Sequence, residues 1–223
     1  MAHYDPNQFT PLKAGMYRAA QRFCLAPFFL VNNRLEVKDA EKIPAEGPLI
    51  VTANHLSMLD PPLLAAVMQR PVAFMAKEEL FTSPLAVRAF KFMCAFAINR
   101  THPEPSTFKA ARDVLRRGWA LVIFIEGTRN KTPGRLLNPA IGPAYVARMN
   151  NTPILPIGIM GTTRRFGKAY ARVGNLIQPS QNLEATTWEV MEALSQLTGF
   201  QLPPERELAD ATQWQPQHRR AFT

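Results

Sequence analysis

The chain has 223 residues, enough for one large domain or two small ones, and 47% of them are hydrophobic, so a full apolar core can form. Lysine and arginine number 26 against 17 aspartate and glutamate residues, and the formal charge of +9 points to an anionic partner: a nucleic acid, an acidic lipid surface or a phosphorylated substrate. Two cysteines, Cys24 and Cys94, exclude a disulfide framework, are not spaced for a metal, and favour a reducing cytoplasm.

The first predicted element is a basic helix from Pro11, followed by the aromatic cluster Phe28-Phe29. One side of this helix gathers apolar residues, namely Leu12, Met16, Ala19 and Phe23. The pattern fits a helix docked at a membrane interface, and it also fits a helix packed on the protein body. The longest apolar run, 23–31, contains Pro27, whereas a spanning helix needs about twenty residues. We therefore expect no transmembrane segment.

The next clear elements are a strand over 49–53 and a helix over 61–69, joined by the turn Asn54-His55-Leu56-Ser57-Met58-Leu59-Asp60. Asp60 stands at the expected N-cap and Pro61 at the first helical position. On such a turn the side chains of His55 and Asp60 can meet, although on one continuous helix they would face apart. Ser57 is expected to make a local backbone bond, and the apolar residues Leu56, Met58 and Leu59 to be core.

The chemistry of this pair suggests a general base. A carboxylate bound to one imidazole nitrogen fixes the tautomer and stabilises the imidazolium that forms when the other nitrogen accepts a proton. The alternative interpretation is that Asp60 only caps a helix and His55 is a loop histidine. The two interpretations are compatible, because a carboxylate can accept several hydrogen bonds.

Basic residues follow three further predicted strands. Lys77 comes after the strand 72–76 and Arg100 after 95–98, while the loop Glu126-Gly127-Thr128-Arg129 follows 119–125. If these strands lie side by side with 49–53, all these groups line one edge of the sheet together with His55. A glutamate, a flexible glycine, a hydroxyl and an arginine make a suitable loop for a phosphate or a polar headgroup.

Alternating strands and helices predict one α/β domain with a mixed, mostly parallel central sheet flanked by helices. The remaining elements are a strand over 153–159 and helices near 83–92, 107–117, 140–149 and 188–197. Pro156 indicates an edge or an irregular place in the sheet. We divide the chain into an N-terminal amphipathic membrane-docking segment (1–34), the α/β domain (35–200) and a loosely packed C-terminal tail (201–223).

Four blocks together resemble the glycerolipid acyltransferase family, specifically the 1-acyl-sn-glycerol-3-phosphate acyltransferases. The run from His55 to Asp60 matches the H-x4-D signature, and 124–129 matches the EGTR block. The segments 94–100 and 153–157 resemble the second and fourth blocks, with Cys94 and Asn99 departing from the usual residues. The N-terminal helix resembles membrane-docking helices of some members.

This resemblance implies transfer of an acyl group from acyl-CoA or acyl carrier protein to the free hydroxyl of 1-acylglycerol-3-phosphate. His55 is then the base and Asp60 its orienting group, without an acyl-enzyme nucleophile. Lys77, Arg100 and Arg129 hold the phosphate, and Glu126, Gly127 and Thr128 shape its site. No metal and no cofactor beyond the acyl donor is implied, and the enzyme works peripherally on an anionic membrane, at its cytoplasmic face.

Other functions stay open at this point. The acceptor could be glycerol-3-phosphate or another lysolipid. A basic nucleic-acid-binding protein explains the charge but not the His55–Asp60 pair, and no aromatic-rich binding motif appears, so we expect no nucleic-acid partner. A hydrolase or phosphatase lacks a second metal-ligand cluster or a serine elbow.

Overall fold

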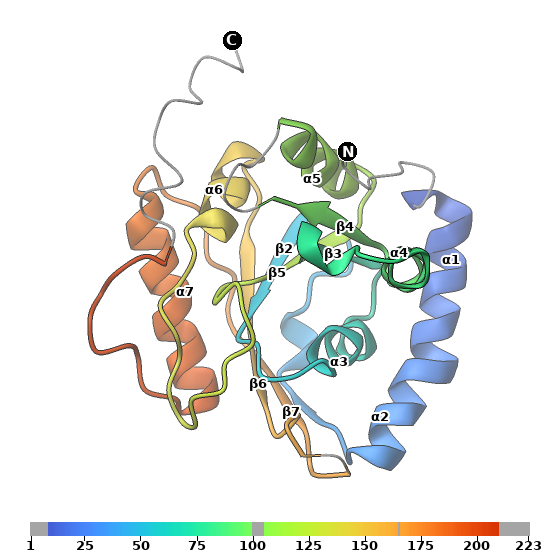
Figure 1. Ribbon diagram of the computed structural model, residues 1–223, viewed down its shortest axis with the longest axis horizontal. Helices are drawn as coiled ribbons and strands as arrows, with labels where there is room; N and C mark the ends of the chain where they lie inside the picture. Colours follow the sequence, from blue (N-terminus) through green and yellow to red (C-terminus); the bar gives the residue numbers. More distant parts are fainter. Residues whose placement is uncertain (1–8, 100–104, 165, 210–223) are drawn as a thin grey trace.

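A seven-stranded sheet forms the centre of the computed structural model, which describes residues 9–99, 105–164 and 166–209 (Figure 1). The strand order is β1-β7-β6-β2-β5-β3-β4. Neighbouring strands are parallel except for the antiparallel pair β6–β7. The strands are β1 (Glu36–Lys38), β2 (Leu49–Ala53), β3 (Val72–Lys77), β4 (Ala95–Ile98), β5 (Ala120–Phe124), β6 (Ile154–Met160) and β7 (Tyr170–Val173). The prediction of a single α/β domain with a mixed, mostly parallel sheet is confirmed.

Helices cover both faces of the sheet. The helices are α3 (Asp60–Val67), α4 (Pro84–Phe92), α5 (Pro105–Arg116), α6 (Gly142–Met149) and α7 (Leu183–Thr198), with short 3-10 turns at Ala40–Lys42 (η3) and Glu78–Leu80 (η4). Successive residues of β5 alternate between two apolar layers: Leu121 packs with α5, α6 and α7, whereas Val122 packs with α3. Burial on both faces explains why this strand reads as one continuous apolar run.

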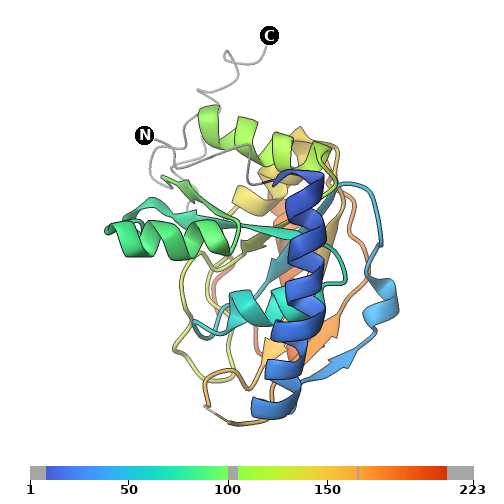
Figure 2. The ribbon, with the colours of Figure 1, turned by 90° about the vertical axis from the view of Figure 1, so that its right-hand side faces the viewer.

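The N-terminal helical segment consists of α1 (Pro11–Ala20), a π-helical turn (η2, Gln21–Leu25) and α2 (Ala26–Asn32), and it lies along one side of the molecule (Figure 2). The side facing the body buries Gln21 and Phe29. The opposite side carries the predicted apolar stripe, with Leu12 77%, Met16 66% and Phe23 74% exposed. The helix therefore packs on the body through its other face, and the stripe points away from the protein.

The Gln21 side chain fastens this segment to α3. Its amide nitrogen donates to the carbonyl oxygens of Ala65, Met68 and Arg70 at 2.8, 3.0 and 3.0 Å. Carbonyl groups at a helix C-terminus have no partner within the helix. A buried glutamine from another segment supplies donors here, so α1–α2 is an integral part of the folded domain.

Several details differ from the sequence-based expectations. The strand β7 was missed, because Tyr170 and Arg172 place polar groups in a short segment whose buried residues are Ala171 and Val173. Helix α7 begins at Leu183, earlier than predicted, after the Asn182 side chain accepts from Ala185 N. Asp60 is the first residue of α3 rather than its N-cap, which is Leu59.

Pro156 lies in an interior strand, so the edge alternative was wrong and the irregular one was right. The β6–β7 pairing begins only at Ile157, opposite Val173, and Ile154 makes an isolated bridge to Ile177. Between these two pairs, two residues of β6 face three of the other segment, and Pro156, which has no N–H to donate, occupies this interruption.

No helix in the described ranges is both long enough and apolar enough to cross a bilayer. The proposed boundaries near residues 34 and 200 stay predictions. Contacts cross the second boundary: Leu136 N donates to Gln201 O, and Arg206 forms an ion pair with Glu192.

Candidate functional site

The carboxyl ends of β2, β5, β3 and β4 lie next to one another in the sheet. This is the side-by-side order under which the predicted polar groups share one edge. His55 follows β2 and Glu126 follows β5, so the two residues lie on adjacent strand ends. Lys77 ends β3, one strand further, at roughly 10 Å from β2 by the usual strand spacing. Arg100 lies outside the described residues, two positions past Ile98, which pairs with Lys77.

Asn54 anchors the start of the turn 54–60, which follows β2. Its buried amide side chain donates to Ile159 O at 2.9 Å and accepts from Ile159 N at 2.8 Å. The side chain thus replaces the peptide group that β2 would have offered to β6, at the point where the main chain leaves the sheet. His55 accordingly projects from a fixed position at the sheet edge.

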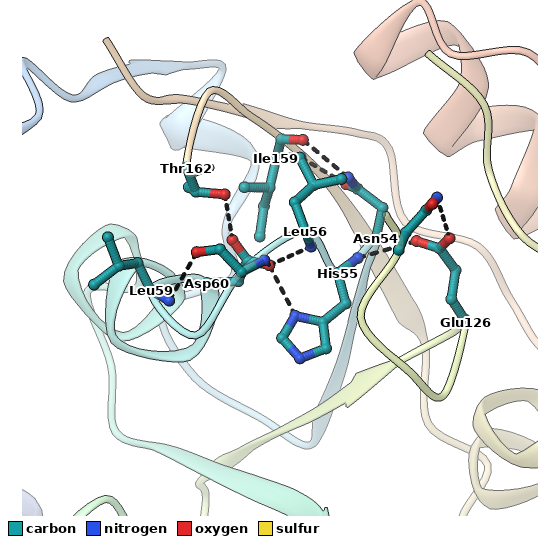
Figure 3. Close-up of polar contacts among 10 residues, drawn as sticks. Asn54, His55, Leu56, Leu59, Asp60, Glu126, Ile159 and Thr162 are labelled. Carbon is teal, nitrogen blue, oxygen red and sulfur yellow. Dashed lines mark hydrogen bonds and ion pairs between the residues drawn. The ribbon is translucent and has the colours of Figure 1, made fainter. Parts of the chain in front are cut away.

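Asp60 is buried and accepts four hydrogen bonds (Figure 3). Its Oδ2 lies 2.8 Å from His55 Nδ1 and accepts from the backbone N–H groups of Leu56 and Ser57 at 2.5 and 2.7 Å. Its Oδ1 accepts from Thr162 Oγ1 at 2.6 Å. Burying a carboxylate without donors is very costly, and these contacts replace the lost water.

The His55 ring is held with one nitrogen bound and the other available. Because an ionised carboxylate has no hydrogen to donate, Nδ1 carries the hydrogen and Nε2 keeps its lone pair. The ring stacks on Phe124 at 4.0 Å between centroids, with 18° between the planes. The side chain is 16% exposed, and Figure 3 shows the second ring nitrogen pointing away from Asp60. This arrangement suits a general base.

The Glu126 side chain binds the backbone of His55. Its Oε1 accepts from His55 N at 3.0 Å, while Oε2 accepts from Asn130 Nδ2 at 2.7 Å and Leu137 N at 2.8 Å. Burial raises the pKa of the Glu126 carboxyl, and the hydrogen bonds from Leu137, His55 and Asn130 act in the opposite direction. The predicted contact between Glu126 and substrate stays a prediction. In the structure, this carboxylate connects the His55 backbone to Asn130 and Leu137.

The loop that carries Thr128 and Arg129 is tied to His55 at both ends. Glu126 binds the His55 N–H, and Asn130 N donates to the His55 carbonyl at 2.6 Å. Gly127 between them has φ +65°, a conformation that side-chain-bearing residues adopt with strain. Thr128 and Arg129 are exposed. No ion pair joins Arg129 to Glu126 among the residues described.

Two predictions concerned the turn itself: a local backbone bond for Ser57 and burial of the apolar residues such as Met58. Leu59 N donates to Ser57 Oγ at 2.9 Å, which confirms a local role for this hydroxyl. Met58 is 63% exposed, so its assignment to the core was wrong. Leu59 is partly buried against the apolar layer that includes α3.

Thr162 was missed by sequence reasoning. It follows β6, just as His55 and Glu126 follow their strands, but a lone threonine carries no charge to draw attention. Gly161 before it has φ +79°, and a Cβ there would lie 2.0 Å from Lys168 O. A polar residue after a glycine at the end of a buried strand was the available signal.

Comparisons with known proteins show the family of this chain. The acyltransferase family profile matches residues 34–160, more than half of the chain. The chain belongs to the acyltransferase family. Among the described residues of this acyltransferase, no group of three or more His, Cys, Asp or Glu side chains is placed to hold a metal.

Curated relatives and a solved structure resemble the acyltransferase. The 1-acyl-sn-glycerol-3-phosphate acyltransferase of Bacillus subtilis is 26% identical over 159 residues, covering 70% of this chain and 77% of the relative. An enzyme of the same name from Cocos nucifera is 32% identical over 127 residues, but the chain spans only 41% of its length. The crystal structure of the 1-acyl-sn-glycerophosphate acyltransferase PlsC from Thermotoga maritima has the same fold, with a TM-score of 0.65, 24% identity and coverage of 83% of this chain and 78% of that one.

Replacing Thr162 by valine tests whether its hydroxyl positions the pair. Valine keeps the shape of threonine but leaves Asp60 Oδ1 without its donor, and losing such a contact costs about 1–3 kcal/mol. We expect turnover to fall about tenfold with little change in the Michaelis constants, and Thr162→Ser to restore it. Equal turnover in the valine and serine variants, with both folded, contradicts the positioning role.

Proposed function

We propose that this acyltransferase moves a fatty acyl group from a thioester donor, acyl-CoA or acyl carrier protein, to the free hydroxyl of 1-acylglycerol-3-phosphate, giving phosphatidic acid for phospholipid synthesis. The observation that carries the proposal is the His55–Asp60 pair at the sheet edge that bears Lys77 and Arg129. Family membership and the names of the relatives support it. Glycerol-3-phosphate or another lysolipid is the alternative acceptor, and an assay of several acceptors against both donors tests the choice.

The reaction needs one proton relay. An alcohol is a weak nucleophile, so His55 Nε2 removes its proton as the oxygen attacks the thioester carbonyl. The C–O bond forms, the C–S bond then breaks, and the proton on the imidazolium passes to the departing sulfur. Asp60 stabilises the imidazolium between these steps. Ser57 is held by Leu59 N, which supports direct transfer without an acyl-enzyme.

His55→Ala tests the mechanism. Loss of a general base lowers rates by about a hundredfold or more, so we expect transfer to fall at least that far in a folded protein. Asp60→Asn should lose most of the activity, because an amide binds Nδ1–H less strongly and brings its own N–H against the turn donors. Turnover with each variant is compared with its circular dichroism, and near wild-type turnover in folded His55→Ala rules out this mechanism.

We further propose that Arg129 and Arg100 select the phosphate of the acceptor. Arg129 is exposed, lies between two residues that bind the His55 backbone, and has no ion pair within the described ranges. A guanidinium offers two parallel donors to phosphate oxygens, which lysine does not. Lys77 lies at the same edge and is half-buried, and we assign it to the same phosphate.

Arg129→Ala and Arg100→Ala should discriminate between acceptors. Losing one charge-assisted contact costs about 1.5–3 kcal/mol, so kcat/KM for lysophosphatidate should fall roughly tenfold to 150-fold. Monoacylglycerol, which has no phosphate, should be little affected. Glu126→Gln is the contrasting variant, because it disturbs the His55 turn and should harm both acceptors equally. The same proportional loss on both acceptors in the arginine variants means that they do not bind the phosphate.

The proposal includes peripheral binding to an anionic membrane surface, at its cytoplasmic face, through α1–α2. The exposed stripe of Leu12, Met16 and Phe23 supports it, with Lys13 and Arg22 exposed on the same segment. Full burial of such side chains is worth about 1.5–3 kcal/mol each, and the basic residues add attraction to acidic headgroups.

Vesicle sedimentation with Leu12→Gln/Met16→Gln tests this contact. The full chain is used, since Gln21 and Phe29 make the helix part of the fold. We expect weaker binding to vesicles containing phosphatidylglycerol, and only partial release of the wild type by salt, because the apolar share is not screened. The matched control is Leu176→Gln, an exposed leucine (43%) elsewhere. Unchanged binding in the double variant excludes the stripe as the contact.

A further inference from the structure

Helix α4 presents an apolar stripe to solvent. Leu85 and Phe92 are 79% and 81% exposed and lie seven residues apart, so they occupy the same face of the helix. Ala89 lies between them, with Arg88 beside it, and all four are exposed. The opposite face packs inward, where Phe90 lies 4.8 Å from the ring of Phe81. Large apolar side chains aligned on a helix and exposed to this degree indicate a surface that contacts a membrane or another protein.

A hollow of about 450 Å³ adjoins this stripe. Phe81, Pro84 and Val87 supply apolar walls, and Arg88 and Lys91 stand at the hollow as cations. Helix α4 itself contains no acidic residue, and the nearest in sequence are Glu78 and Glu79 on η4. Apolar walls with two cations match the chemistry of an acidic phospholipid: acyl carbons below and a negative headgroup above.

We propose that the outer face of α4, together with this hollow, is a second membrane-contact surface that binds acidic phospholipids of the bilayer. The inference rests on the proposed function, because it extends the membrane contact assigned above to α1–α2. Continuity with that segment favours a lipid surface over a protein partner. Cys94, two residues past α4, belongs to the buried apolar cluster against which Tyr17 of α1 packs, and α1 and α4 lie on the same side of the molecule (Figure 2).

The position of α4 in the chain connects this proposed membrane contact to the sheet edge that bears His55. Strand β3 ends at Lys77 on the catalytic edge of the sheet, and only η4 and a short loop separate it from the start of α4. The start of α4, which bears Leu85, therefore follows the carboxyl edge of the sheet, and the end of α4, which bears Phe92, leads back to the start of β4. A bilayer touching both helices meets the catalytic edge from the side, where a lysolipid with its chain in the membrane can present its polar end.

The test compares vesicle binding of the full-length wild type and Leu85→Gln/Phe92→Gln, with Leu176→Gln as the control. Vesicles of phosphatidylcholine with phosphatidylglycerol are used without acyl donor, so binding is measured independently of catalysis. Removing two inserted side chains should weaken binding about tenfold or more. Transfer to a lysophosphatidate embedded in vesicles should fall in parallel, while transfer to a water-soluble short-chain analogue should be unchanged.

A second variant, Arg88→Gln/Lys91→Gln, tests the charges without touching the apolar stripe. We expect a reduced preference for phosphatidylglycerol over pure phosphatidylcholine and a weaker dependence of binding on salt. Wild-type vesicle binding in both double variants overturns the proposal. So does a change from dimer to monomer at unchanged vesicle affinity, which would identify a second copy of the chain as the occupant, or selective loss of activity with an acidic protein donor, which would identify that donor. If the wild type transfers no acyl group at all, the proposed function fails, yet the vesicle comparison still decides the role of α4.

Discussion

A single buried carboxylate, that of Asp60, joins two segments that lie 102 residues apart in the chain. It accepts from the backbone of the turn after β2, from the His55 ring, and from Thr162 beyond β6. Buried away from water, it is stable only while these donors stay in place. The turn cannot open, nor can the end of β6 shift, without exposing an unpaired charge to the interior, so the geometry of the imidazole is a property of the whole sheet edge.

The second carboxylate, Glu126, acts on the same residue in a different way. Asp60 contacts the ring, whereas Glu126 and the Asn130 N–H hold the two peptide groups of His55. The loop bearing Arg129 is thereby attached to His55 at two points, and Leu137 N donates to Glu126 on the far side of the loop. If this loop binds the acceptor phosphate as proposed, the anion is kept at a constant distance from His55 Nε2. Such fixed placement of two reacting groups lowers the entropy cost of bringing them together.

Much of the fold could be predicted, because strands ending in polar residues and helices starting at proline are local signals. The meeting of His55 with Asp60 and the shared edge of four strands followed from them. Thr162 could not be found in this way, since its partner lies 102 residues away and a hydroxyl has no distinctive pattern. The missed strand β7 and the interruption at Pro156 likewise depend on pairing between distant segments. The direction of the α1 stripe was undecided for a different reason: the same periodicity serves a packed helix and a membrane-facing one.

The Gln21 contacts decide that direction, and they also couple the N-terminal helical segment to the His55–Asp60 pair. Gln21 binds the carbonyl groups at one end of α3, and Asp60 is the first residue at the other end. A helix of this length spans about 12 Å and behaves as a rigid element. Gln21, on the segment that carries the exposed stripe, and the Asp60 carboxylate therefore act at opposite ends of the same short helix, α3. If α1 binds a membrane as proposed, that contact fixes the height and tilt of α3 and, with it, the direction from which an acceptor hydroxyl approaches His55. Because α3 also packs in the apolar layer beneath β2 and β5, the N-terminal segment and the sheet edge that bears His55 cannot move independently.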